Sequence, residues 1–177
     1  MLRLVGLACC SVEPLLASPP VVNTSFGPLQ GTAQASGVSK YQGIPYAQPP
    51  NGTRRWQPPL GWATPWGPGV RNAVTAGASC IQGQLYAPGG PRSEDCLYLN
   101  VWVPPGGEHA PGSLPVAVFL HGGAFIFGRG ADYNAESFSQ NHGIVFVSIN
   151  YRLGALGWML VPADDSAEPG VYQARVQ

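Results

Sequence analysis

Two uninterrupted apolar runs constrain this chain more than any other feature. They read PVAVFL at residues 115–120 and IVFVSI at residues 144–149. Such runs are typical of strands buried on both faces of a sheet. Residues 133–141 between them predict a short helix that ends at Gly143. Since a strand, a helix and a second strand form a right-handed crossover, the runs predict neighbouring or near-neighbouring parallel strands of one α/β sheet.

The chain before these runs predicts mostly strand and coil. Residues 21–34 and 38–44 predict two short strands, separated by Ser36-Gly37 as in a hairpin. Residues 45–70 contain seven prolines, which excludes a helix or a central strand, so we expect an ordered coil. We expect that coil to be anchored by its three tryptophans, which are Trp56, Trp62 and Trp66.

Residues 97–103 alternate in the manner of a strand with two different faces. One face carries Leu97, Leu99, Val101 and Val103, and the other carries Tyr98, Asn100 and Trp102. Together these elements predict a small antiparallel start that leads into a central, mostly parallel sheet.

Charge excludes several classes of partner. The formal net charge is zero, and only 10% of the residues are charged, against roughly 25% in typical soluble domains. A chain so balanced has no electrostatic footprint for nucleic acid or anionic lipid. No apolar run approaches the roughly 20 residues of a membrane span, so we expect no transmembrane segment.

The N-terminus resembles a secretory signal. An arginine precedes a short apolar run, which predicts a signal peptide over residues 1–18 and one domain over residues 19–177. A disordered start is the alternative. Two sequons make Asn23 and Asn51 candidate glycosylation sites, although such triplets also arise by chance.

Four cysteines divide between the two parts of the chain. Cys9 and Cys10 fall in the expected signal peptide, which leaves Cys80 and Cys96. In an oxidising compartment these two should pair across a short loop rich in glycine and proline. A metal site is the weaker alternative, because no CxxC motif or histidine cluster accompanies them.

The candidate chemistry lies directly after the first apolar run. His121-Gly122-Gly123-Ala124 places small residues where a strand ends. Acyl transfer by a serine hydrolase needs backbone N–H donors aimed at a developing oxyanion, and a His-Gly-Gly-small loop is suited to supply them. Taken alone, a glycine-rich segment is more often simply a turn.

Further motifs accompany this loop in a specific order. GIPYA at 43–47, EDCLYLN at 94–100, the His-Gly-Gly loop and NYRLG at 150–154 follow one another along the chain. As a set they resemble the type-B carboxylesterases, the family of α/β-hydrolases that also contains lipases and cholinesterases. The resemblance covers about residues 20–160 and implies the N-terminal part of an α/β-hydrolase fold.

The resemblance also implies roles for individual residues. Gly123 and Ala124 match the oxyanion-hole positions, although the family usually has a third glycine in place of Ala124. Cys80 and Cys96 match the first disulfide of the family. In cholinesterases the corresponding loop carries a tryptophan that binds choline. The residues between Cys80 and Cys96 include no tryptophan, which argues against that subgroup. The implied substrate is a small-molecule or lipid ester, and the implied mechanism requires no metal and no organic cofactor.

Charged and polar residues near these motifs are given structural roles. Arg55 and Glu94 match a structural ion pair near the disulfide, with ordinary surface charge as the alternative. Asn150, Tyr151 and Arg152 are expected to support the end of a buried strand.

The 177 residues contain no Gly-x-Ser-x-Gly elbow for a nucleophile. His121 belongs to the loop, and neither His109 nor His142 has the context of a triad base. We therefore expect a carboxylic ester hydrolase family member without nucleophile, acid or base in this sequence, inactive by itself. A non-catalytic adhesion or binding protein of the same fold and an inert fragment are the alternatives.

Overall fold

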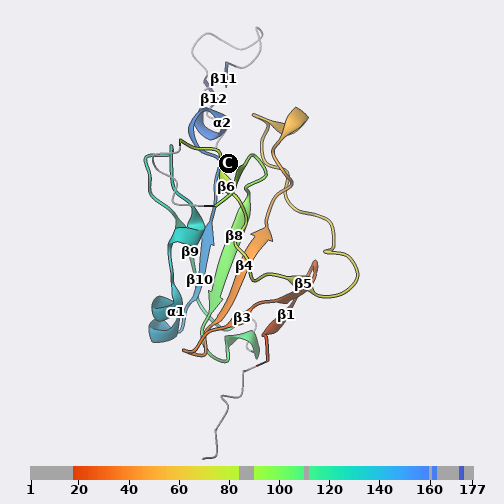
Figure 1. Ribbon diagram of the computed structural model, residues 1–177, viewed down its shortest axis with the longest axis vertical. Helices are drawn as coiled ribbons and strands as arrows, with labels where there is room; N and C mark the ends of the chain where they lie inside the picture. Colours follow the sequence, from red (N-terminus) through yellow and green to blue (C-terminus); the bar gives the residue numbers. More distant parts are fainter. Residues whose placement is uncertain (1–17, 84–89, 110–111, 160, 163–171, 174–177) are drawn as a thin grey trace, which may run out of the picture.

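The computed structural model describes residues 18–83, 90–109, 112–159, 161–162 and 172–173 (Figure 1). The expected signal peptide therefore lies outside the described residues, apart from Ser18. The described strands are β1 (Val21–Thr24), β2 (Gly27–Gln30), β3 (Thr32–Ala33), β4 (Ser39–Pro45), β5 (Arg71–Asn72), β6 (Ser79–Cys80), β7 (Arg92–Ser93), β8 (Tyr98–Val103), β9 (Val116–Leu120), β10 (Val145–Ile149), β11 (Val161–Pro162) and β12 (Tyr172–Gln173). The described helices are α1 (Glu136–His142) and α2 (Gly154–Trp158), with 3-10 turns η1 (Gly52–Arg54), η3 (Gly107–His109) and η4 (Gly130–Asp132).

A five-stranded sheet in the order β3-β4-β8-β10-β9 forms the centre of the molecule. Its parallel pair is β9 with β10, in register from Val116 opposite Val145 to Leu120 opposite Ile149. This confirms that the two apolar runs are adjacent parallel strands. The other pairs of this sheet are antiparallel, so the described part of the expected α/β-hydrolase fold is a mixed sheet, in which the antiparallel start leads into the parallel pair.

Helix α1 covers one face of the sheet. It begins at Glu136, later than the expected residue 133, because the backbone of Tyr133 is extended after η4, with φ −103° and ψ 115°. It ends as expected at Gly143, whose φ of 61° lies in the left-handed region that glycine adopts without strain. Trp102 is buried with Ala135 beneath this helix. The face of β8 that carries Trp102 is therefore buried at Asn100 and Trp102 and partly buried at Tyr98, which the alternating pattern did not indicate.

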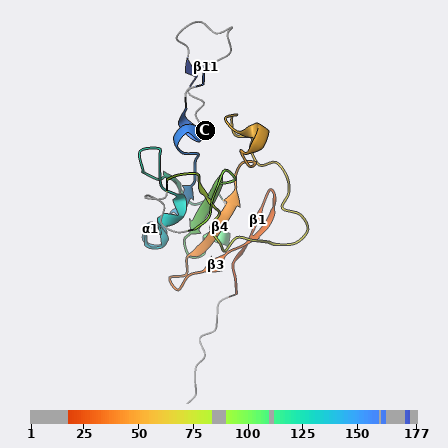
Figure 2. The same ribbon diagram turned by 45° about the horizontal axis from the view of Figure 1, so that its top comes forward.

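A small sheet of β1, β2 and β5 covers the opposite face, and α1 and β1 lie on either side of β4 in both views (Figure 2). Leu29, Tyr41 and Ala73 form the buried cluster between the small sheet and the central one. The predicted single strand over residues 21–34 is three strands, because the chain reverses at Ser25-Phe26. The predicted turn at Gly37 does connect β3 to β4.

Strand β9 differs from the buried strand that its apolar run predicts. Val116, Val118 and Leu120 are 60%, 59% and 64% exposed, whereas Phe119 on the other face packs against Tyr133 and Phe146. The physical reason is that no described element packs over this face of β9, the last strand of the sheet among the described residues. An apolar run shows that both faces can be covered, but neighbouring elements decide whether they are.

The proline-rich segment is an ordered coil, as expected, with η1 as its described helical turn. Trp62 and Trp66 are half-buried and lie 5.6 Å apart between ring centroids, but Trp56 is 43% exposed and does not act as an anchor. Within the described ranges, no helix has the length and apolar character needed to cross a membrane.

Candidate functional site

A strained turn follows the carboxyl end of β9. The carbonyl of Gly123 accepts hydrogen bonds from the N–H of Ile126 at 3.0 Å and of Phe127 at 3.1 Å. The two central residues, Ala124 and Phe125, have φ angles of 51° and 62°, which a type I′ turn requires. Left-handed backbone at residues other than glycine costs energy and is concentrated at functional sites. The φ of Gly123 is 122°, which explains the need for glycine there.

The turn leaves two consecutive N–H groups available. The backbone N–H groups of Gly123 and Ala124 donate to no acceptor among the residues that the structure describes. The turn is nevertheless anchored, because the carbonyl of Phe125 accepts a hydrogen bond of 2.7 Å from the N–H of Gly154. Adjacent N–H donors held in a rigid turn are suited to bind a negatively charged oxygen.

These residues line an apolar pocket of about 500 Å³. Its wall carries no Asp, Glu, Lys or Arg from the described chain. Aromatic rings form much of the wall: Phe125 lies 4.2 Å from Trp158 between ring centroids, and Tyr151 lies 6.2 Å from Trp158. Tyr46 also lines it, and burial raises the pKa of its hydroxyl to about 12. The described part of the pocket lining is therefore uncharged at neutral pH and suited to neutral apolar groups.

His121 supports the loop from beneath. It is 3% exposed, and its ring stacks on Tyr151 with centroids 4.3 Å apart. The Tyr151 hydroxyl donates to the His121 carbonyl at 2.5 Å. Burial lowers the pKa of the imidazole, so it is neutral at physiological pH. This geometry agrees with a packing role and not with that of a base.

The other two histidines lie away from the pocket. His109 ends η3, and His142 ends α1 immediately before β10. Because β9 and β10 are parallel, the residues that precede β10 lie at the opposite end of these strands from the turn. His109 follows β8, whose last residues lie beside the start of β10, so both histidines lie at the end opposite the turn.

The structure forms both of the residue pairs that the resemblance implies, one of two cysteines and one of two charged residues. Cys80 and Cys96 form a disulfide with Cα atoms 4.9 Å apart. Arg55 donates from Nε to Glu94 Oε2 at 2.7 Å, and a second contact joins Nη2 to Oε1. The Arg55 hydrogen bond lowers the pKa of the Glu94 carboxyl. The pair is exposed, so we expect its contribution to stability to be small.

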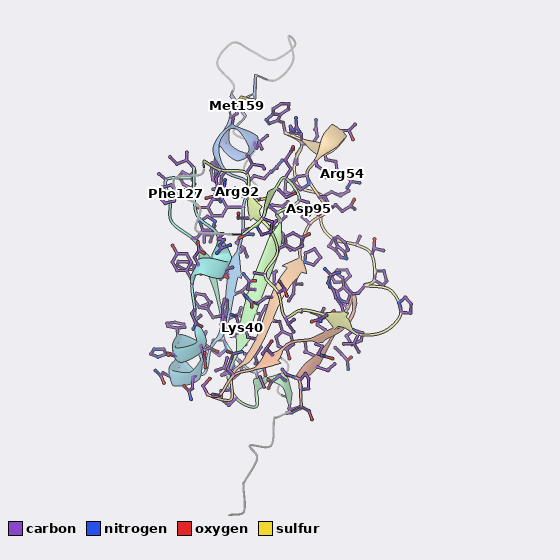
Figure 3. All side chains as sticks on the ribbon, viewed as in Figure 1. Lys40, Arg54, Arg92, Asp95, Phe127 and Met159 are labelled. Atoms are coloured by element: carbon purple, nitrogen blue, oxygen red, sulfur yellow. A yellow bond between two sulfur atoms is a disulfide. The ribbon has the colours of Figure 1, made fainter. Side chains whose placement is uncertain are left out.

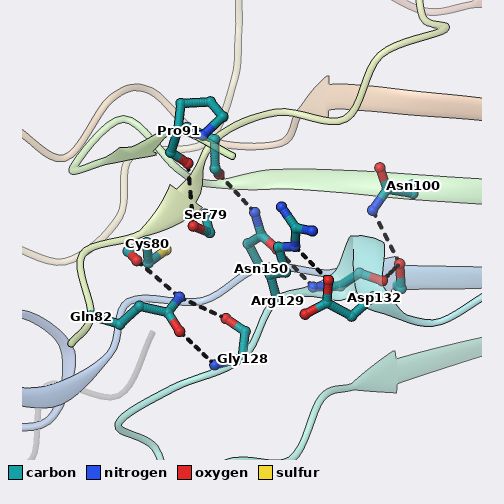
Figure 4. A network of polar contacts seen from close by, with 12 residues as sticks. Ser79, Cys80, Gln82, Pro91, Asn100, Gly128, Arg129, Asp132 and Asn150 are labelled. Atoms are coloured by element: carbon teal, nitrogen blue, oxygen red, sulfur yellow. Dashed lines mark hydrogen bonds and ion pairs between the residues drawn. The ribbon is translucent and has the colours of Figure 1, made fainter. Parts of the chain in front are cut away.

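Two amide side chains connect the disulfide segment to the loop after the turn (Figure 4). Asn150 donates to the carbonyls of Ala78 and Cys96 and accepts from the N–H of Gly130, which confirms that it is structural. Gln82 was missed by sequence reasoning. It contacts Gly128, and its only sequence signal is its position two residues after a cysteine.

Figure 3 places Phe127, Arg92, Asp95 and Met159 toward the end of the molecule opposite Lys40. The pocket lies at this end, because its lining residue Trp158 precedes Met159 in the chain. No group of three or more His, Cys, Asp and Glu side chains able to hold a metal is found in the described segments.

Comparison with known proteins agrees with this geometry. A family model described as the carboxylesterase family matches residues 18–170. The chain is 38% identical over 157 residues to phenmedipham hydrolase of Pseudarthrobacter oxydans, covering 83% of this chain and 31% of that protein. It is 35% identical over 198 residues to neuroligin-2 of Mus musculus, covering 86% of this chain and 23% of that protein.

A solved structure shows the same fold. The structure titled PNB esterase is 36% identical and superposes with a TM-score of 0.69, covering 80% of this chain and 28% of that one. The chain thus spans less than a third of the length of these relatives, and the shared part has the α/β-hydrolase fold. Because the family model matches residues 18–170, the chain belongs to the carboxylesterase family.

Proposed function

We propose that this chain carries the oxyanion-binding part of a serine-type carboxylic ester hydrolase. One observation supports this above all: the N–H groups of Gly123 and Ala124 lack acceptors among the described residues and belong to a strained turn on the wall of an apolar pocket. Preorganised donors of this kind often supply the largest single part of catalysis in acyl transfer.

Ester hydrolysis by this mechanism requires a nucleophile and a base in addition to the two N–H donors. A serine oxygen bonds to the ester carbon while a base accepts its proton, and the carbonyl electron pair moves onto oxygen. Gly123 and Ala124 would donate to that oxyanion. Its collapse expels the alcohol, which takes up a proton, and water then hydrolyses the acyl-enzyme in a second cycle of the same kind. The sequence contains no Gly-x-Ser-x-Gly elbow, so the chain supplies the donors and not the nucleophile.

The pocket favours neutral substrates. Its lining from the described chain has no charged side chain, and aromatic rings form much of its surface. A small-molecule or lipid ester with apolar groups would lose little solvation there, whereas a charged group would be desolvated without a partner.

The 177-residue chain alone should show no esterase activity above background. A chromogenic short-chain ester assay measures turnover, and a fluorophosphonate probe labels any activated serine. Turnover together with labelling of a serine between residues 18 and 177 would contradict the proposal.

A loop exchange tests the oxyanion role directly. Residues 121–128 replace the matching segment of phenmedipham hydrolase, and Ala124→Gly within the exchanged loop is the matched control. Both chimeras should retain kcat within about tenfold of the parent, since backbone donors are kept. Removal of one donor of this type typically lowers kcat about 10²–10³-fold, so a loss of that size in both chimeras would refute the assignment.

A non-catalytic binding protein of the same fold is the second candidate, and the similarity to neuroligin-2 supports it. An inert fragment is the third, and the exposed apolar residues of β9 support it. Size-exclusion chromatography and circular dichroism of the purified chain separate these two, because a binding protein must be folded and monodisperse.

Secretion follows from the same proposal. The Cys80–Cys96 disulfide is typical of an oxidising compartment, and both Asn23 and Asn51 are exposed. Expression in a secretory pathway should give a chain cleaved after residue 18, with a mass that decreases on deglycosylation. A retained N-terminus and a mass unaffected by glycosidase would contradict this.

A further inference from the structure

The amide of Gln82 holds a residue 46 positions away at two points (Figure 4). Its Nε2 donates to the carbonyl of Gly128 at 3.0 Å, and its Oε1 accepts from the N–H of Gly128 at 2.8 Å. The second Nε2 hydrogen serves the carbonyl of Cys80 at 3.1 Å. Three of the four hydrogen bonds available to a primary amide are therefore made, all to backbone.

Gly128 in turn contacts the two residues that precede the turn. A Cβ placed on Gly128 would fall 2.5 Å from His121 Nδ1 and 2.7 Å from the carbonyl oxygen of Gly122. With a φ of 112°, Gly128 is held in a conformation that other residues rarely adopt. Because the Gly123 carbonyl also closes the turn onto Phe127, a displacement of Gly128 would be transmitted to both ends of the turn.

The other end of the connection is rigid. Gln82 lies two residues after Cys80, which is buried and joined to Cys96. Asn150 ties the carbonyl of Cys96 to the N–H of Gly130, two residues beyond Gly128. The disulfide segment thus provides a fixed support for the loop.

We propose that Gln82 is a positioning residue of the oxyanion turn, holding Gly128 and thereby the N–H groups of Gly123 and Ala124 against the disulfide segment. This rests on the function proposed for those N–H groups. Gln82 itself contacts no reacting atom, and the amide acts only by fixing backbone.

The test is NMR on the unreduced 177-residue chain, which needs no ester chemistry. Gln82→Leu removes the three hydrogen bonds at similar volume. We expect the Gly128 amide to exchange with solvent about tenfold faster and the Gly123 and Ala124 resonances to shift, while amides of β8 and β10 keep their exchange rates. A merely structural contribution would accelerate all amides together and leave the turn resonances in place.

Two further variants complete the design. Gln82→Glu places a carboxylate oxygen against the carbonyl oxygens of Gly128 and Cys80, so it should shift the Gly123 and Ala124 resonances as Gln82→Leu does, and it serves if the leucine variant does not fold. Gln140→Leu is the matched control, because Gln140 donates to the carbonyl of Ser36 at 3.1 Å, a long-range bond of the same type remote from the turn. It should leave Gly123 and Ala124 unchanged.

The proposal is overturned if Gln82→Leu leaves the Gly123 and Ala124 resonances unmoved, or if Gln140→Leu moves them equally. Neither result bears on ester hydrolysis. Failure of the loop exchange with a positive NMR result would instead reject the proposed function and keep the coupling.

Discussion

Gly123 should be intolerant of even the smallest side chain. A Cβ on Gly123 would fall 1.9 Å from the carbonyl oxygen of Phe127, and the φ of 122° is rarely adopted by other residues. Backbone strain of this kind costs about 1–3 kcal/mol, and forced overpacking costs about 1–3 kcal/mol more. Reduced entropy of the unfolded chain offsets about 0.4–1 kcal/mol. We therefore expect Gly123→Ala to lower the free energy of unfolding by about 3 kcal/mol.

Urea unfolding followed by tryptophan fluorescence measures this change. With an m-value near 2 kcal/mol/M, the midpoint should fall by about 1.5 M. The matched control is Gly122→Ala, whose Cβ would meet nothing within 4 Å and which should stay within about 1 kcal/mol of the parent. The reverse variant, Ala124→Gly, relieves about 1–2 kcal/mol of left-handed strain and loses about 0.5–1 kcal/mol to backbone entropy, so it should be slightly stabilising. Equal midpoints for the alanine variants of Gly122 and Gly123 would refute the reasoning.

Three further outcomes follow from the structure. Reduction of the Cys80–Cys96 disulfide, whose partners are 16 positions apart, should cost about 3 kcal/mol, and unreduced peptide mapping that finds two free thiols in secreted protein would contradict the pairing. Because burial lowers the pKa of His121, the unfolded chain binds the proton more readily. The free energy of unfolding should therefore have its full value above about pH 6.5 and decrease as the pH falls, by at most about 1.4 kcal/mol per pH unit. His121→Phe should flatten urea midpoints between pH 7 and 5, and an unchanged slope would count against this. Val118→Lys, on the exposed face of β9, should raise the monomer fraction in size-exclusion chromatography at high concentration, whereas Val118→Thr should not; equal behaviour would argue against association through β9.

The parallel pair of apolar strands and the loop that follows the first of them could be read from the sequence. Hydrophobic periodicity is local, and it reports which segments form strands. The order of short motifs pointed to the family, because each motif is confined to a few neighbouring residues. The position of Gly123 and Ala124 at the end of β9 follows from these two sources together, whereas their role in binding an oxyanion stays a prediction.

Long-range geometry could not be read in the same way. The apolar run of β9 does not reveal that Val118 is exposed, since that depends on which elements lie beside the strand. The left-handed backbone of Ala124 is imposed by turn closure, against the local preference of alanine. Gln82 looked like an ordinary loop residue, because its partner lies 46 positions away.

The sequence by itself therefore determined the parallel pair of apolar strands, the order of the motifs and the identity of the residues at the turn. The tertiary structure alone decided that two N–H groups of that turn face no acceptor in the described chain, that the described lining of the pocket beside them is uncharged, and that an amide from the disulfide segment holds Gly128. The physical reason is that periodicity and motifs are properties of neighbouring residues, whereas satisfied and unsatisfied hydrogen bonds depend on segments that only folding brings together.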